Sequence, residues 1–210
     1  GTLVTKKLAK EIVEVSCDEW RTSVHSPSIR VDNFLRGRKK TLQSFRGIKY
    51  IAEWKRKLLK DLPKLEIWMV LTKFNIHQIK SMIEKASFLE ANSVSLRLVN
   101  PPRTNPFYPS ANQFKKLINA EDEYQKLGSK LGIEIRSHFS LDDIPLKDGG
   151  IACMIPFHEM VVFADGRVSP CCNFIMCDEN SEGIENVRNK ALIDIWFGEK
   201  FNLFRKMMIE

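Results

Sequence analysis

Apolar residues along the first 140 positions follow two alternating spacings. Four segments have the spacing expected of helices: Thr5–Glu14, Thr41–Asp61, His77–Ala91 and Asn112–Leu131. Four shorter segments have the length and composition of strands: Glu19–His25, Leu65–Thr72, Ser93–Val99 and Ile133–Ser137. Residues 26–33, which contain a proline, are expected to form a loop.

The regular order of helix and strand predicts right-handed crossovers and a parallel sheet with its helices outside. The mostly apolar run Leu65–Thr72 is typical of a strand that is covered on both faces. Four strands are about half of the eight in a (β/α) barrel. We therefore predict an α/β fold: the C-terminal half of a partial TIM-like barrel, or a small open sheet.

The pattern changes after residue 140. Residues 141–150 (LDDIPLKDGG) indicate a linker, because acidic residues, a proline and a glycine pair follow one another. Beyond it, Glu159–Phe163 and Arg167–Ser169 are expected to pair as a hairpin around Asp165-Gly166. An amphipathic helix, Ala191–Met208, is interrupted at Gly198.

The predicted domains are thus a partial barrel over 1–140 and a small α+β region over 151–210. The second region has few apolar residues for a core of its own, so a bound metal would help to stabilise it.

Charge and hydropathy exclude some classes of protein. The formal net charge is +7, and the basic run 36–40 (RGRKK) indicates a solvated helix start rather than a nucleic-acid site, because no aromatic residues are interleaved with it. No apolar run approaches the roughly 18 residues of a membrane span. No leader resembles a signal peptide, so we expect a cytoplasmic protein. The chain begins with Gly1, which suggests a piece of something longer.

Five cysteines are present, and four of them cluster near the C-terminus: Cys153, Cys171, Cys172 and Cys177. An odd number without secretory features argues against a disulfide framework. Clustered thiols in an intracellular chain favour metal or redox ligands, whereas Cys17 suits an ordinary buried position.

The C-terminal motifs occur in an order that is typical of one family. They are Cys153, Asp165-Gly166, Pro170-Cys171, Gly183 with Asn186, and Leu192 with Ile195-Trp196. This order resembles the SPASM or shorter twitch domain, the auxiliary-cluster region of radical S-adenosylmethionine enzymes. In this chain two residues separate the glycine of the loop from its asparagine.

The first 140 residues resemble the barrel of the same family. EWRTSVHS is similar to its fourth strand, which ends in a serine, and DNFLRG is similar to the Arg-Gly that follows. The family's CxxxCxxC loop and its closing cysteines are absent from the chain, so we expect a fragment that is inactive by itself.

The resemblance implies [4Fe–4S] clusters and S-adenosylmethionine as cofactors. An electron from the cluster of the CxxxCxxC loop would generate a 5′-deoxyadenosyl radical, which abstracts hydrogen from a peptide, a sugar or a cofactor precursor. Ser23 would hydrogen-bond S-adenosylmethionine, and Arg36 would pair with its carboxylate. A flavodoxin- or ferredoxin-like protein would supply electrons, and the auxiliary cluster would accept an electron or anchor the substrate.

Hairpin geometry bears on the cluster ligands. An antiparallel pair with a tight turn brings its ends to about 5 Å, so Cys153 and Cys171 could face one cluster. Neighbouring strand residues point to opposite faces, so Cys171 and Cys172 are not expected to serve one cluster equally. Cys177 is a candidate third ligand. Zinc is the rival metal because His158 is near, but no CxxC pair supports it.

Other residues and another class of function complete the expectations. Asn75 and Arg97 lie at or near strand ends, where structural roles are favoured over contact with substrate. His25 is expected to point to the face opposite Ser23, without a catalytic role. The alternative function is a non-enzymatic zinc- or nucleic-acid-binding module that uses the cysteines structurally.

Overall fold

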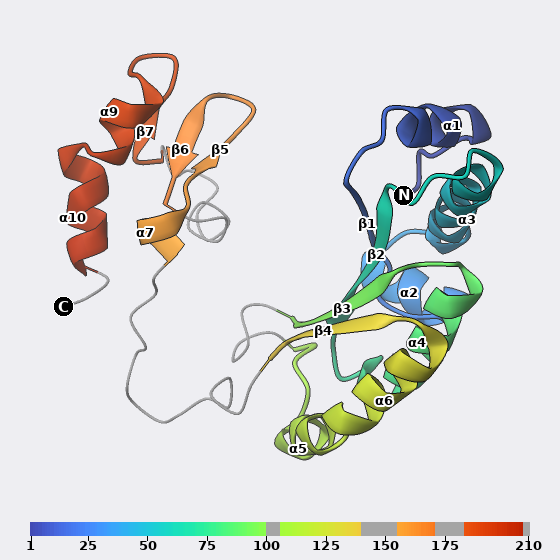
Figure 1. The fold of residues 1–210 in the computed structure, drawn as a ribbon. Helices are drawn as coiled ribbons and strands as arrows, with labels where there is room; N and C mark the ends of the chain where they lie inside the picture. The colour runs from blue at the N-terminus through green and yellow to red at the C-terminus, as the bar shows by residue number, and fades with distance from the viewer. Residues whose placement is uncertain (100–105, 140–154, 171–182, 208–210) are drawn as a thin grey trace. The chain divides into compact units, whose positions relative to one another are not determined.

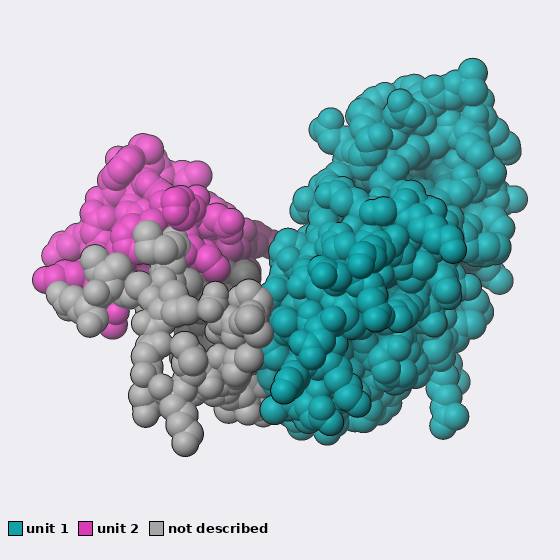
Figure 2. Space-filling view, turned by 60° about the horizontal axis from the view of Figure 1, so that its bottom comes forward, with its two compact units in different colours: residues 1–146 teal, residues 147–210 magenta. Residues whose placement is uncertain are grey.

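A computed structural model describes residues 1–99, 106–139, 155–170 and 183–207. The chain forms two compact units, residues 1–146 and residues 147–210 (Figure 2). Each unit has its own cluster of buried apolar side chains. Within the described ranges, every helix is too short or too polar to cross a bilayer.

Unit 1 is built of helices and strands that alternate along the chain. In order they are α1 (Lys6–Glu14), β1 (Glu19–Ser23), α2 (Ile29–Arg36), α3 (Thr41–Lys57), β2 (Lys64–Leu71), the short 3-10 helix η1 (Ile76–Gln78), α4 (Ile79–Phe88), β3 (Ser93–Leu98), α5 (Ala111–Asn119), α6 (Glu121–Leu131) and β4 (Glu134–His138).

The four strands form one parallel sheet in the order β1-β2-β3-β4. Figure 1 shows α3, α4 and α6 on one side of this sheet. The side chains under these helices are apolar and buried, as for Ile67 and Met69 of β2 and Leu96 of β3. This arrangement confirms the predicted α/β fold with a parallel sheet and helices outside.

Register places the other side chains of each strand on the opposite face. Arg21, Glu66, Ser93 and Glu134 lie in one row across the sheet, and Ser23, Trp68, Ser95 and Arg136 lie in the next. We call this the polar face. It differs from the apolar face because its side chains are mostly charged or hydroxylated, and side chains alternate between the two faces of a strand.

Residues 26–33 were expected to form a loop, but Ile29–Arg36 is helix α2. The helix ends at Gly37, whose φ of 63° is left-handed, as is common after a helix C-terminus. It is held by Asp32, a fully buried residue whose carboxylate accepts hydrogen bonds from His25 N at 2.6 Å and from Thr41 Oγ1 at 2.5 Å. These tertiary bonds explain why the local sequence pattern alone did not predict the helix.

The long helix expected over 112–131 is two helices, α5 and α6, which meet at Ala120. The N–H of Ala120 is shared between the carbonyls of Lys116 and Leu117, a pattern of helix ends. The helix expected over Thr41–Asp61 ends at Lys57, and Leu59 beyond it has a left-handed φ of 51°.

Unit 2 is a small α+β region. Its described elements are α7 (Ile155–His158), β5 (Val161–Val162), β6 (Arg167–Ser169), β7 (Glu185–Asn186), α9 (Leu192–Trp196) and α10 (Glu199–Met207). The predicted hairpin is confirmed as the antiparallel pair β5–β6, with a shorter first strand than expected. The sequence did not predict β7, which pairs with β6, or α7.

Candidate functional site

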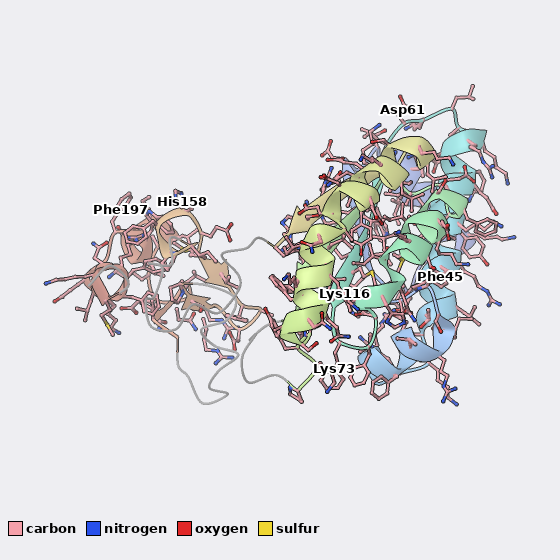
Figure 3. All side chains as sticks on the ribbon, turned by 90° about the horizontal axis from the view of Figure 1, so that it is seen from below. Phe45, Asp61, Lys73, Lys116, His158 and Phe197 are labelled. Atoms are coloured by element: carbon pink, nitrogen blue, oxygen red, sulfur yellow. The ribbon has the colours of Figure 1, made fainter. Side chains whose placement is uncertain are left out.

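The carboxyl ends of the four strands lie at one edge of the sheet because all four strands run in the same direction. Figure 3 shows Asp61, which precedes β2, and Lys73, which follows β2, at opposite ends of unit 1. Ser23 is the last residue of β1 and is exposed at the edge marked by Lys73, in register with Trp68 of β2. Catalytic and cofactor-binding residues of (β/α) barrels gather at this edge.

A cavity of about 260 Å³ opens at the same edge. Residues from five separate segments line it: His25, Leu35, Val70 with Thr72, Val99 and Phe107. Most of this lining is apolar, with an imidazole and a hydroxyl as polar groups, which is the usual make-up of a small-molecule site.

His25 lines this cavity, so the expectation that it points away from the site was wrong. Its Nδ1 accepts a hydrogen bond from Val70 N at 3.2 Å, so in the neutral ring the proton is assigned to Nε2. Burial lowers the pKa of His25, the neighbouring Arg36 lowers it further, and Asp32 opposes both. A neutral imidazole can donate through Nε2 to a bound ligand.

Asn75 joins the segments that follow β1 and β2 by hydrogen bonds. Its Oδ1 accepts from Thr72 N at 2.6 Å and from Thr72 Oγ1 at 2.9 Å. Its Nδ2 donates to the carbonyls of His25 at 2.5 Å and Val70 at 2.8 Å. Asn75 is fully buried, and these four bonds give it the structural role favoured from the sequence.

Arg36 lies at the end of α2, where the Arg-Gly motif placed it. Its side chain is 11% exposed, with Nη1 lying 3.3 Å from Asp32 Oδ2 and 3.0 Å from Ser44 Oγ. Asp32 in turn holds His25 through its backbone N–H. Arg36 is thus joined to the cavity residue His25 through one shared carboxylate.

Phe107 lines the cavity, and two further phenylalanines pack against its ring to form an aromatic rim. The rings of Phe34 and Phe74 meet edge-on with centroids 5.3 Å apart, and Phe107 lies 5.4 Å from Phe74 and 6.1 Å from Phe34. Phe34 and Phe74 are exposed. The rim therefore offers an apolar aromatic surface beside the polar groups of the strand ends.

The polar face holds five charged residues in one network near the amino ends of the strands. Arg136 Nη1 contacts Glu19 Oε1 at 3.2 Å and Glu66 Oε1 at 3.1 Å, and its Nη2 contacts Glu134 Oε2 at 2.9 Å. Arg21 contacts Glu66 at 2.9 Å and Glu19 at 2.5 Å. Hydrogen bonds from Arg136 lower the pKa of Glu19 and Glu134. Each carboxylate of the network thus has an arginine partner.

The next rows of the polar face contain Trp68, Arg97 and His138. The guanidinium carbon of Arg97 lies 4.1 Å from the centroid of the Trp68 ring, and that of Arg21 lies 5.3 Å from it. Trp68 Nε1 donates to Glu66 Oε2 at 2.6 Å. Arg97 is in register with His138, whose pKa is lowered by burial and by the charge of Arg97.

In unit 2 the Asp165-Gly166 turn is held by both of its residues. Asp165 accepts from Arg167 N at 3.0 Å and from Arg167 Nε at 2.7 Å, which lowers the pKa of the carboxyl group. Gly166 has a φ of 86°, which favours glycine. Its N–H donates to Phe163 O at 2.8 Å. The motif therefore forms the tight turn that the sequence predicts.

A small apolar core and the hydrogen bonds of one arginine hold unit 2 together around this hairpin. Val168, Ile195 and Phe201 form its buried core. Arg205 ties α7 to the C-terminal helices, because its Nε donates to Pro156 O at 2.9 Å and its Nη1 donates to Trp196 O at 2.7 Å. The hairpin and the start of α7, which border the predicted cluster ligands, are thus fixed by the same small core.

The four predicted ligands, Cys153, Cys171, Cys172 and Cys177, lie outside the described residues. No group of three or more metal-ligating side chains occurs within ranges 1–99, 106–139, 155–170 and 183–207. His158, the candidate zinc partner, is exposed on unit 2, as is Phe197 (Figure 3). Cys17 in unit 1 packs partly buried against the core, as expected, and its Sγ donates to Glu19 O at 3.3 Å.

Comparison with protein families identifies the C-terminal region. Residues 153–210 match SPASM, described as an iron-sulfur cluster-binding domain. The match begins at Cys153 and includes all four clustered cysteines. A comparison with curated proteins finds no match.

Solved structures share the fold of the chain. Streptococcus suis SuiB is 12% identical with a TM-score of 0.69, over 97% of this chain and 49% of that one. Native anSMEcpe with bound S-adenosylmethionine is 14% identical with a TM-score of 0.69, over 100% of this chain and 58% of that one. This chain therefore spans about half the length of the structures that it matches.

Family and fold point to the same class. The SPASM region lies at the C-terminus, and the partial barrel before it has the fold of proteins that were solved with S-adenosylmethionine bound. The predicted resemblance of this chain to radical S-adenosylmethionine enzymes with a SPASM-type iron–sulfur domain is thereby confirmed.

Proposed function

We propose that this chain is part of a radical S-adenosylmethionine enzyme: unit 1 contributes to the S-adenosylmethionine site, and unit 2 holds an auxiliary [4Fe–4S] cluster. The observation that carries the proposal is the SPASM match over the region that contains the four clustered cysteines. Thiolates are the usual ligands of iron–sulfur clusters, so this donor set fits the group. S-adenosylmethionine would supply the radical that takes a hydrogen atom from the substrate, with an electron from a cluster held by a CxxxCxxC loop, a motif that is absent from these 210 residues.

Cys153 and Cys171 are the proposed ligands of the auxiliary cluster, with Cys177 or Cys172 as a further thiolate. The support is the antiparallel hairpin: Val161 of β5 is opposite Ser169 of β6, and Cys171 follows Ser169 by two positions. The turn at Gly166 reverses the chain so that its two arms run side by side.

Ser23 and Arg36 are the proposed contacts of S-adenosylmethionine in unit 1. Ser23 is exposed at the carboxyl edge of the sheet, where its hydroxyl can hydrogen-bond the cofactor. A guanidinium carries five N–H donors, and Nη1 of Arg36 serves Asp32 and Ser44. The remaining donors are those proposed for the cofactor's carboxylate.

We propose that the substrate is a peptide. SuiB has been solved with its precursor peptide SuiA, and native anSMEcpe with the Kp18Cys peptide, and both share the fold of this chain. The rim formed by Phe34, Phe74 and Phe107 would pack against apolar side chains of such a substrate. The backbone of the peptide would lie over the cavity beside His25.

The test is anaerobic reconstitution of the chain with iron and sulfide. We expect bound iron and inorganic sulfide, lost in Cys153→Ala and Cys171→Ala and retained in Cys17→Ala, because Cys17 lies in unit 1 with a backbone partner. Titration with S-adenosylmethionine should show weaker binding for Ser23→Ala. One zinc per chain, with no sulfide, would instead support a structural zinc module.

A further inference from the structure

Arg97 is a cation that has no anionic partner among the residues that the structure describes. Its Nε is buried and lacks a hydrogen-bond acceptor within those residues. Arg97 lies near the carboxyl end of β3, one row beyond Trp68, and its guanidinium stacks on that ring at 4.1 Å. A buried N–H group without an acceptor costs free energy, so its presence at a strand end calls for an explanation.

The other two arginines of the polar face are fully engaged. Arg21 and Arg136 share the carboxylates of Glu19, Glu66 and Glu134, all at ion-pair distances of 3.2 Å or less. No carboxylate within the described ranges makes such a contact with Arg97. The face is therefore divided: carboxylates and their arginines near the amino ends, and a single guanidinium toward the carboxyl edge.

Trp68 stabilises the charge of Arg97 when no ligand is bound. Stacking on an indole stabilises a guanidinium, and it fixes the plane of the fork while leaving its N–H groups free to donate. The five-membered network carries three carboxylates and two guanidiniums, so its residual negative charge also attracts Arg97 over a longer distance. Neither effect supplies an acceptor for Nε.

The neighbours of Arg97 favour an anion as that acceptor. His138 is its partner in register on β4, and Ser23 is the partner of Trp68 on β1. Both side chains are exposed at the edge and can donate hydrogen bonds. Val99, two residues beyond Arg97, and Val70, its partner on β2, line the cavity. Arg97 thus lies in the same row of the sheet as one of the residues that line the cavity.

From this arrangement we infer that Arg97, stacked on Trp68, is the receptor for a carboxylate that a ligand brings to the carboxyl edge of the sheet. The planar fork of arginine matches a carboxylate with two parallel hydrogen bonds. Two ligands of the proposed function carry this group: a peptide substrate, through an acidic side chain or its C-terminus, and S-adenosylmethionine, through its methionine part. In the second case Arg97 would take the place proposed above for Arg36 at the cofactor's carboxylate. The inference rests on that proposed function for the identity of the ligand.

The experiment follows the Nε–H resonance of Arg97 in the ¹⁵N-labelled 210-residue chain, assigned with Arg97→Lys. S-adenosylmethionine is compared with its decarboxylated form, and N-acetylglycine with N-acetylglycinamide. We expect a downfield shift only with the carboxylate member of a pair. A response to the first pair assigns the site to the cofactor, and a response to the second assigns it to the substrate.

Variants supply the control. Arg97→Gln should weaken binding of the responding carboxylate about ten- to a hundredfold, and Arg97→Lys less, because lysine keeps the charge but not the fork. Arg56→Gln removes an exposed arginine that pairs with Glu90 elsewhere and should leave the affinity unchanged. Near-ultraviolet circular dichroism verifies that each variant is folded.

Two results would overturn the inference: no shift with either carboxylate, or an equal loss of affinity in Arg97→Gln and Arg56→Gln. Iron and sulfide content of the same samples reports separately on the proposed function. If the chain binds iron but shows no response to a carboxylate, only the role of Arg97 is contradicted. If the chain responds to N-acetylglycine but does not bind iron, only the proposed cluster binding is contradicted.

Discussion

Arg136 on β4 lies with Nη1 3.1 Å from Oε1 of Glu66 on β2, although β3 separates the two strands. The same nitrogen reaches Glu19 on β1 at 3.2 Å. One side chain thus spans the whole sheet on its polar face. Such a contact requires a sheet curved toward that face, as in the wall of a barrel.

Replacing Arg136 with leucine should destabilise unit 1. The side chain of Glu66 is 3% exposed, and removing one cation from a buried carboxylate is costly. Arg21 remains beside Glu66, and Arg136 is itself partly exposed, so we expect a loss of about 2 kcal/mol in the free energy of unfolding. Urea denaturation measures it. The control is Glu134→Gln, a highly exposed partner, with an expected loss of about 0.5 kcal/mol or less. Equal losses would mean that Glu66 does not depend on Arg136.

Asn75→Ala should destabilise the carboxyl edge more than most single substitutions. It removes an acceptor for two donors of Thr72 and a donor for the carbonyls of His25 and Val70, all at a buried site. Unpaired buried groups cost about 1–3 kcal/mol each, and partial access of water reduces the sum, so we expect about 3 kcal/mol. Asn112→Ala, at an exposed position of α5, is the matched control and should be near neutral. An Asn75→Ala protein as stable as the control would rule out the fastening role.

The elements that could be predicted are those whose stabilising interactions come from residues nearby in the sequence. The run Leu65–Thr72 and the helices on either side carry their periodicity within a few turns, so the parallel sheet could be predicted. Helix α2 could not, because Asp32 stabilises it through His25 and Thr41, which lie outside the helix. Tertiary hydrogen bonds of this kind leave no periodic signal in the sequence.

The candidate site shows the same limit. Ser23 could be picked out because it ends a strand, and strand ends carry function in barrels. His25 and Phe107 reach one cavity from segments far apart in the chain, and that meeting depends on the packing of whole elements. The difference between Arg136, saturated by carboxylates, and Arg97, which has none among the described residues, depends on cross-strand register, which composition cannot reveal.

Stability should depend on the titration of His25. Its pKa is lowered in the folded chain, chiefly by burial, so below the unfolded-state value of about 6.5 the unfolded chain binds more protons than the folded one. Stability is therefore lost as the pH falls from about 6.5 toward the folded pKa. Protonation would also remove the Nδ1 acceptor for Val70 N.

The variant His25→Asn separates this contribution from others. Its amide oxygen can still accept from Val70 N but does not titrate, so the urea midpoint should fall less between about pH 7 and pH 5 than in the parent chain. His138, whose pKa is also lowered, should keep part of the dependence. An unaltered profile for His25→Asn would show that His25 does not titrate in this range.

Gly166→Ala should destabilise unit 2 by about 2–3 kcal/mol. An added Cβ would lie 2.5 Å from Asn186 Oδ1, and the left-handed φ of 86° is itself unfavourable to alanine by about 1 kcal/mol. Asn186 cannot move away freely, because its Oδ1 accepts from Arg188 N at 2.9 Å, and Val187 N donates to Gly166 O at 2.9 Å. Gly37→Ala is the control: its φ is 63° but nothing lies within 4 Å of the new Cβ, so only about 1 kcal/mol should be lost.

Amide hydrogen exchange measures both variants, with faster exchange expected for residues 161–169 and 183–187 in Gly166→Ala and unchanged exchange in unit 1. If both substitutions cost the same, the contact with Asn186 adds nothing to the strain of the turn, and β7 does not brace the hairpin that leads to Cys171.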